Sequence, residues 1–168
     1  SKLAAEYYVH TIGARWGTTT VALRIFNAYG PGQPLLPSHS PVVPRFIYQA
    51  LGSGSLVIFG NGDQTRDFVY VDDVVRALVA SMTADGIARR TINIGSGEET
   101  RISDVAETVL DLVDSSSNIM YSSVQSGGVM RLRADLTLAR KLLGYAPQMT
   151  LKDGLRRMMD EDPRFRRQ

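Results

Sequence analysis

The spacing of apolar and polar positions predicts a chain in which helices and strands alternate. Apolar residues three and four positions apart predict helices, and short runs of β-branched and apolar residues predict strands. The predicted helices cover residues 1–16, 42–51, 74–82, 104–113, 136–143 and 151–159. The predicted strands cover residues 18–26, 56–59, 90–94 and 118–124, with another strand entered at Arg66. This mixture of elements predicts one compact α/β domain.

Several residues are expected to set the ends of these elements. Gly17 and Gly144 are candidates to close the helices before them, and Ser103 is a candidate N-cap. Strand 18–26 is expected to be buried and to break at Asn27, where an Asn-Gly-Pro-rich turn begins. Residues 160–168 are polar enough to predict a frayed end.

A polar, glycine-rich turn at residues 60–67 runs into the next strand and carries Arg66. The planar guanidinium of an arginine on a rigid element suits the binding of a phosphate group. The alternative is a surface hairpin in which Arg66 pairs with Asp67 or Asp73. Local sequence alone favours that alternative, because charged loop residues are usually solvated.

Composition excludes several classes of protein. The chain has 168 residues and a formal charge of +2, which does not indicate a nucleic-acid partner. It has no cysteine and two separated histidines, so no metal site is expected, and a reducing, cytoplasmic location fits. No apolar run reaches the ~18 residues of a membrane span. The arginine-rich C-terminal end leaves polyanion binding as a weak alternative.

Four stretches, in this order and spacing, resemble one enzyme family. Their sequences are SKLAAE (1–6), RIFNAYGPGQ (24–33), FGNGDQTRDFVYVDD (59–73) and NIGSG (93–97). They are similar to the extended short-chain dehydrogenase/reductases that act on nucleotide sugars, in particular the UDP-glucose 4-epimerase-like group of NAD-dependent epimerase/dehydratases. The later stretches Ala134-Asp135, LLGY (142–145) and LKDGL (151–155) extend the resemblance over nearly the whole chain.

The resemblance implies the C-terminal part of an extended Rossmann-type fold with a small mixed α/β substrate-binding domain. Residues 1–30 would form the last helix and strand of the Rossmann domain, and residues 31–168 the substrate-binding domain, with 68–95 partly returning to the Rossmann sheet. In the family, a glycine fingerprint and a catalytic Tyr precede the lysine that Lys2 matches. The chain is therefore expected to be the C-terminal half of such an enzyme, inactive by itself.

The resemblance also assigns roles to individual residues. Lys2 would be catalytic, because it would hold the nicotinamide ribose of NAD and lower the pKa of the Tyr that removes a sugar proton. Ile25 and Ala28 would lie beside the nicotinamide. Asn27 and Arg66 would contact the diphosphate and sugar, so the family register reverses the local preference at Arg66.

The remaining substrate contacts would come from a strand and a loop. Val57 and Phe59 match strand residues that flank the nucleobase in the family. Gln125 stands where a second diphosphate-binding arginine is expected, which puts one phosphate contact or the usual substrate in doubt. Arg131 or Arg133 would be the candidates to replace that charge.

The implied activity is an epimerase reaction on a nucleotide sugar, most simply a UDP-sugar, with hydride passing between a sugar carbon and NAD. Decarboxylases and 4,6-dehydratases of the family share this half of the chain and remain alternatives. A non-catalytic nucleotide-sugar-binding module is a further alternative, suggested by the altered stretch at Gln125. The aromatic face of helix 1–16 implies a homodimer, the alternative being that this face covers only its own sheet.

Overall fold

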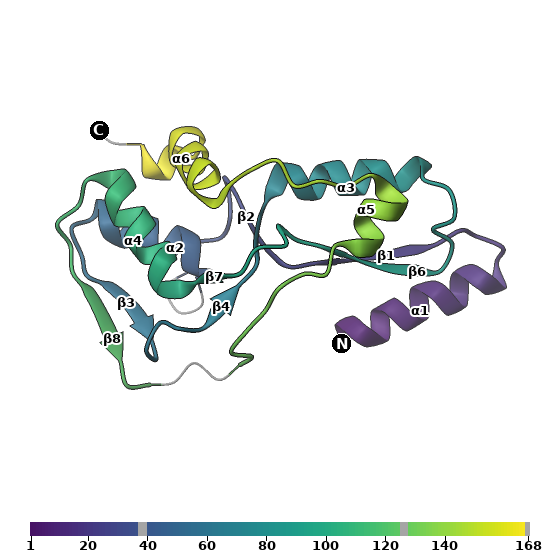
Figure 1. The fold of residues 1–168 in the computed structure, drawn as a ribbon, viewed down its shortest axis with the longest axis horizontal. Helices are drawn as coiled ribbons and strands as arrows, with labels where there is room; N and C mark the ends of the chain where they lie inside the picture. The colour runs from purple at the N-terminus through teal and green to yellow at the C-terminus, as the bar shows by residue number, and fades with distance from the viewer. Residues whose placement is uncertain (37–39, 125–127, 167–168) are drawn as a thin grey trace.

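The computed structural model describes residues 1–36, 40–124 and 128–166 (Figure 1). The helices are α1 (Lys2–Arg15), α2 (Val42–Leu51), α3 (Val71–Thr83), α4 (Ile102–Val113), α5 (Thr137–Leu143), α6 (Leu151–Glu161) and a 3₁₀ turn (Pro163–Phe165). The strands are β1 (Val21–Ile25), β2 (Asn27–Tyr29), β3 (Leu56–Phe59), β4 (Thr65–Arg66), β5 (Phe68–Tyr70), β6 (Arg90–Ile94), β7 (Thr100–Arg101) and β8 (Ile119–Ser122). The predicted α/β class is confirmed.

One half of the molecule is built on the parallel pair β1 and β6, whose register runs from Val21 opposite Arg90 to Ile25 opposite Ile94. Figure 1 shows α1 on one side of this pair and α3 with α5 on the other. Burial of Ile92 and Ile94 joins β6 to apolar side chains from α3 and α5. The stretch from Ala134 to Tyr145 packs into the same core.

The other half is built on the parallel pair β3 and β8 and on helices α2, α4 and α6. Alternate residues of β3 are buried, so Leu56 and Ile58 face the core while Val57 and Phe59 face away. The apolar stripes of α2 and α4 cover that core at helical spacing. Between the halves lie the short parallel pair β2–β5 and the antiparallel pair β4–β7 (Figure 1).

Several predicted ends are wrong. The first strand does end before Asn27, at Ile25, but residues 27–29 form β2 in register with β5 and not the predicted turn. Ser103 is not the N-cap of α4, since the helix begins at Ile102 with Arg101 as its cap residue. The predicted fraying of residues 160–168 is wrong for the described residues 160–166, because Asp162 and Phe165 are buried. Gly17 and Gly144 do follow their helices in the left-handed conformation, at φ of 64° and 60°.

Strand β1 is less buried than predicted, because within the described chain it pairs with β6 alone. Ile25 is 43% exposed, and Arg24 is exposed and forms a bidentate ion pair with Glu6 of α1. Gly13 lets α1 approach the start of β1, since a Cβ there would lie 2.3 Å from the Thr20 methyl group. Polar contacts and one small residue therefore hold α1 to the sheet.

The apolar side chains of α1 do not cover the sheet. They are 46–76% exposed, so within the described chain this face does not pack on β1 and β6. The exposed residues are Leu3, Tyr7, Tyr8, Val9, Ile12 and Trp16. Helix α3 shows the same feature, because its side chains Val75, Leu78, Val79 and Met82 are 46–82% exposed.

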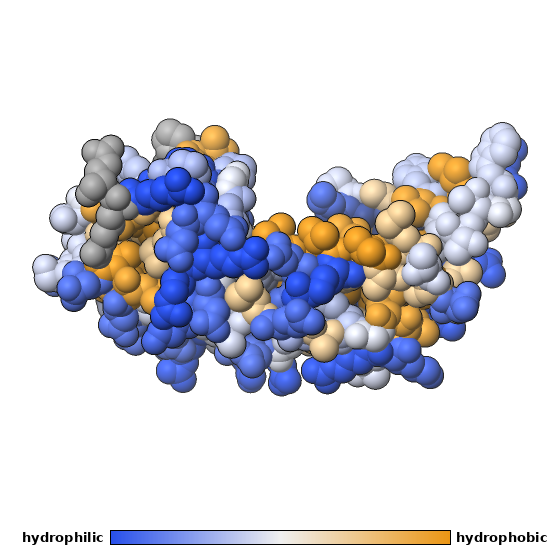
Figure 2. Space-filling view, turned by 90° about the horizontal axis from the view of Figure 1, so that it is seen from above, coloured by the Kyte–Doolittle hydropathy of each residue, from blue (hydrophilic) through white to orange (hydrophobic). Residues whose placement is uncertain are grey.

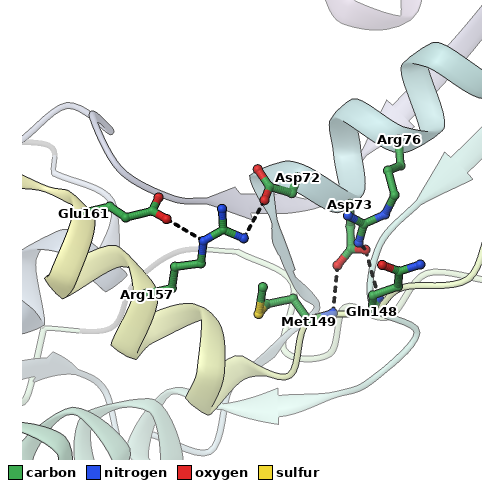
Figure 3. Close-up of polar contacts among 7 residues, drawn as sticks. All are labelled: Asp72, Asp73, Arg76, Gln148, Met149, Arg157 and Glu161. Carbon is green, nitrogen blue, oxygen red and sulfur yellow. Dashed lines mark hydrogen bonds and ion pairs between the residues drawn. The ribbon is translucent and has the colours of Figure 1, made fainter.

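Two neighbouring carboxylates at the start of α3 connect the halves in different ways (Figure 3). Asp73 is fully buried, accepts hydrogen bonds from the backbone N–H groups of Gln148 (2.9 Å) and Met149 (3.2 Å), and pairs with Arg76. Asp72 is partly exposed and pairs with Arg157 of α6 at 2.7 Å. Both negative charges are also stabilised by the positive end of the α3 helix dipole.

These two aspartates form a matched pair for a test of stability. Asp73→Ala is expected to cost about 2–4 kcal/mol of unfolding free energy, because two backbone donors lose their acceptor inside the protein. Asp72→Ala is expected to cost less than about 1 kcal/mol, the usual value for an exposed ion pair. Urea unfolding measures both, and equal losses would contradict this assignment.

Candidate functional site

The centre of the molecule is organised by a buried carboxylate, Asp67, between β4 and β5. Its oxygens accept hydrogen bonds from the Ser96 N–H (2.6 Å), the Ser96 hydroxyl (2.8 Å), the Gly97 N–H (2.9 Å) and the Ala134 N–H (2.9 Å). Gly95 permits this approach, since a Cβ there would lie 2.7 Å from Asp67 Oδ2. Asp67 thus holds the turn after β6 and the chain before α5 close to its own neighbour, Arg66.

Arg66 lies on β4 and is half-buried. Its Nη1 donates to the backbone carbonyls of Thr65 (2.7 Å) and Val129 (2.8 Å). Pairing with Asp67 or Asp73 is wrong, because Asp67 is occupied by backbone donors and Asp73 pairs with Arg76. Among the described residues Arg66 forms no ion pair, so its positive charge has no carboxylate to neutralise it.

The segment beside Arg66 is held by Glu99. Glu99 forms a bidentate ion pair with Arg131 (2.7 and 2.8 Å) and accepts from the Thr65 hydroxyl at 2.5 Å. The hydrogen bond from Arg131, with that from Thr65, lowers the pKa of Glu99 to about 2. The Thr65 N–H also donates to the Met130 carbonyl at 2.8 Å. These contacts fix residues 129–131 against β4.

Arg131 and Arg133 are therefore engaged elsewhere than expected. Arg131 binds Glu99, and the Nε of Arg133 donates to the Gly97 carbonyl at 2.6 Å. Gln125, which occupies the place of the expected second arginine, lies outside the described residues. Within the described chain, Arg66 and Arg133 both border the centre without a partner carboxylate, and Arg66 is the one on a strand next to Asp67.

Phe59 lies at the end of β3, on the face turned away from the core, and is 39% exposed. It borders a hollow of about 280 Å³ that is also lined by Gln64, Val129 and Met130. Val129, which lines this hollow, is the residue whose carbonyl accepts from Arg66, so Arg66 contacts the wall of the hollow without lining it. Val57 points to the same side of β3 as Phe59, two residues earlier.

The other predicted site residues lie at the ends of β1 and β2. Asn27 is exposed and pairs in register with Phe68, and its N–H donates to the Asp67 carbonyl at 3.1 Å. Ile25 ends β1, and Ala28 borders a second hollow, of about 290 Å³, with Tyr29 and Val71. Lys2 is exposed at the start of α1, which Figure 1 places near the middle of the molecule, where β1 ends.

The structure thus gathers the predicted residues into two groups. Phe59 lines one hollow, Arg66 donates to the Val129 carbonyl in its wall, and Asn27 is linked to Arg66 through the neighbouring Asp67. Ala28 lines the second hollow, Ile25 lies three residues earlier at the end of β1, and the two hollows share no lining residue. Figure 2 shows the molecule hollowed between the left-hand lobe and the right-hand part, with apolar atoms along the floor.

Sequence reasoning missed the role of Asp67, which it considered only as a partner for Arg66. A signal was present, because Asp67 opens the apolar run Phe68-Val69-Tyr70, and a carboxylate inside a buried run needs several hydrogen-bond donors. Arg45 of α2 was missed as well. Its guanidinium lies over the Phe59 ring, 5.4 Å from the centroid, a contact that depends on how α2 packs against β3.

This arrangement suits a ligand with an anionic part and a planar part. An unneutralised guanidinium favours a phosphate or carboxylate, and an exposed aromatic ring favours stacking. Among the described residues no group of three or more histidines and carboxylates is placed to hold a metal ion. Within the same residues no helix has the length and apolar character that a membrane crossing requires.

The ion pair between Glu99 and Arg131 gives a pH prediction. Because the folded-state pKa of Glu99 is lowered from 4.5 to about 2, its stabilising effect is complete above about pH 4.5 and is lost as the pH falls toward 2. Carboxyl NMR titration should give a midpoint near 2 for Glu99. In Arg131→Gln the midpoint should rise toward 4.5, and an unchanged midpoint would contradict the pairing.

Comparison with known proteins gives a consistent picture. Residues 1–95 match the model of the NAD dependent epimerase/dehydratase family. The "Uncharacterized UDP-glucose epimerase YtcB" of Bacillus subtilis is 34% identical over 156 residues, which are 92% of this chain and 48% of that protein. UDP-glucuronic acid decarboxylase 1 of Xenopus tropicalis is 34% identical over 154 residues, 92% of this chain and 36% of that protein.

A solved structure agrees with these relatives. The UDP-glucuronic acid 4-epimerase of Bacillus cereus, crystallised with UDP-glucuronic acid and NAD, superposes with a TM-score of 0.85 at 34% identity. The match covers 95% of this chain and 50% of that one. This chain therefore spans about half the length of its relatives, or less.

Proposed function

This chain belongs to the NAD dependent epimerase/dehydratase family, and we propose that it forms the substrate-binding part of a nucleotide-sugar epimerase acting on a UDP-sugar. The observation that carries the proposal is a hollow with the Phe59 ring on its border and Arg66 hydrogen-bonded to the Val129 carbonyl in its wall. A nucleoside diphosphate has both parts that such a hollow suits, a planar base and a pair of phosphates.

The roles of the residues follow from their places around this hollow. Phe59, with Val57 before it, would flank the base, and Arg66 would bind the diphosphate. Asn27 would contact the diphosphate-sugar, because its strand pairs with β5 directly after Arg66 and Asp67. Gln125 would supply a neutral contact where the family resemblance expects an arginine. Binding of the diphosphate would then depend more strongly on Arg66.

The residues at the end of β1 fit the nicotinamide part of NAD. Ile25 is exposed and apolar, and Ala28 borders a hollow lined mainly by apolar side chains, both of which suit a planar ring. Lys2 would hold the nicotinamide ribose and act on the pKa of a tyrosine partner. When bound, NAD would accept and return the hydride, while this chain would orient the sugar toward it.

The domain boundaries form part of the proposal. Residues 1–30 would belong to the Rossmann domain and residues 31–168 to the substrate-binding domain, with 68–95 partly returning to the Rossmann sheet. The pairing of β1 with β6 and the burial of Val69 in the same core support the return of 68–95. A cytoplasmic place in carbohydrate metabolism is proposed with this function.

A decarboxylase or 4,6-dehydratase is the alternative reaction, because a UDP-glucuronic acid decarboxylase is among the relatives. A non-catalytic binding module is the other alternative. Both alternatives would use the nucleotide contacts proposed here, so a nucleotide-binding experiment tests these contacts whichever reaction is catalysed. The product formed from UDP-glucuronic acid, a 4-epimer or a decarboxylated pentose, would separate the reactions.

We also propose a homodimer through α1. Aromatic and aliphatic side chains of this helix are exposed, among them Tyr8 at 66% and Trp16 at 76%. Sedimentation should give roughly twice the 18.5 kDa mass of the chain. Tyr8→Glu should shift the equilibrium toward monomer, whereas Tyr48→Glu on α2, where the tyrosine is 59% exposed, should not. A monomer for the unsubstituted chain would contradict the proposal.

The direct test of the proposed function is UDP binding measured by calorimetry. Arg66→Met should weaken binding about 10- to 150-fold, since a hydrogen bond to a charged group is worth ~1.5–3 kcal/mol. Arg156→Met provides the matched control, because Arg156 is an exposed arginine on α6 whose partner, Asp153, is equally exposed. Its UDP affinity should remain that of the unsubstituted chain.

Melting temperatures must accompany this measurement, because Arg66 also donates to two backbone carbonyls. If Arg66→Met folds and binds UDP as tightly as the unsubstituted chain, the proposed role of Arg66 is wrong. If the unsubstituted chain itself does not bind UDP, the proposed function as a whole is wrong.

A further inference from the structure

Arg45 projects from the first half of α2 toward the end of β3. Its Nη2 donates to the Val57 carbonyl at 3.3 Å, and its guanidinium carbon lies 5.4 Å from the ring centroids of both Phe46 and Phe59. Phe46 is fully buried in the core, whereas Phe59 is partly exposed at the hollow. Arg45 therefore connects the fixed core to the aromatic ring that borders the hollow.

The electrostatic position of Arg45 is unusual for an arginine that only stabilises a fold. Its Nε is buried with no hydrogen-bond partner, and among the described residues it forms no ion pair. Burial lowers its pKa, although an arginine stays charged at neutral pH. Burying half of a cation that makes one long hydrogen bond is energetically unfavourable, and the contacts with the Phe46 and Phe59 rings are the main interactions that offset this cost.

We propose that Arg45 is a positioning residue of the nucleobase subsite, holding the Phe59 ring in the orientation in which a base can stack on it. The inference rests on the proposed function, because it takes the ligand to be a nucleoside diphosphate. The guanidinium of Arg45 lies over the Phe59 ring and Arg45 does not line the hollow, so it acts through Phe59.

The chemistry of the stack indicates which part of the ligand depends on Arg45. A cation on one side of an aromatic ring restrains that ring, which favours the stacking of a planar base on its open face. Arg66 adjoins the hollow through Val129, and the diphosphate would bind there. The loss of Arg45 should therefore weaken binding of the base and leave binding of the phosphates unchanged.

A double-mutant cycle with the 168-residue chain tests this coupling. UDP affinity is measured by calorimetry for the unsubstituted chain, Arg45→Met, Phe59→Ala and the double variant. Arg45→Met should weaken UDP binding about tenfold, and it should cause almost no further loss once Phe59 is alanine. Equal losses in both backgrounds would overturn the proposal, because Arg45 would then act independently of Phe59.

Inorganic pyrophosphate separates positioning from a general structural defect. Arg45→Met should leave the inhibition of UDP binding by pyrophosphate unchanged, whereas Arg66→Met should abolish it. Arg45→Lys should restore part of the UDP affinity, since lysine keeps the cation but lacks the planar group. If Arg45→Met fails to fold, Arg45→Lys carries the test, and a UDP affinity identical to that of the unsubstituted chain would overturn the proposal.

The outcomes distinguish this inference from the proposed function. A chain that binds UDP, loses binding in Arg66→Met and is unaffected by Arg45→Met would retain the proposed function and overturn the role of Arg45. A chain that does not bind UDP would overturn both.

Discussion

The buried carboxylate of Asp67 is the constraint on which the centre of this molecule depends. A negative charge with no exposed surface requires donors, and the backbone of Ser96, Gly97 and Ala134 supplies them. Satisfying one side chain therefore fixes three segments that are distant in sequence. Because Arg66 precedes Asp67 directly, the same bonds set the position of the arginine proposed to bind the diphosphate.

The two halves of the fold contribute different parts of the candidate site. Strand β3 presents Phe59 from the half containing α2 and α4, while β1 and β2 present Ile25 and Asn27 from the side of β6. Asp73 holds the halves together through the backbone of Gln148 and Met149. A ligand between the lobes would thus contact residues whose spacing depends on two buried aspartates.

Much of the fold could be predicted from the sequence, since the apolar spacing in 42–51 and 104–113 is what buries α2 and α4. Arg66 and Phe59 could be proposed as site residues because both lie in the stretch 59–73 that resembles the family. The errors have a common cause. Residues 27–29 form a strand because they pair with β5, and Phe165 is ordered because it packs into the core. The contact of Arg45 with Phe59 joins a helix to a strand. Each of these contacts is made between residues distant in sequence, so the local sequence pattern does not predict it.

The central claim is that a nucleoside diphosphate binds between Phe59 and Arg66. The most direct measurement is an NMR titration of the ¹⁵N-labelled chain with UDP. The account predicts chemical-shift changes concentrated in residues 59–66 and 128–131, with the amides of α6 unaffected. Changes centred on the polar pocket between the ends of α2 and α4, or no changes at saturating UDP, would contradict it.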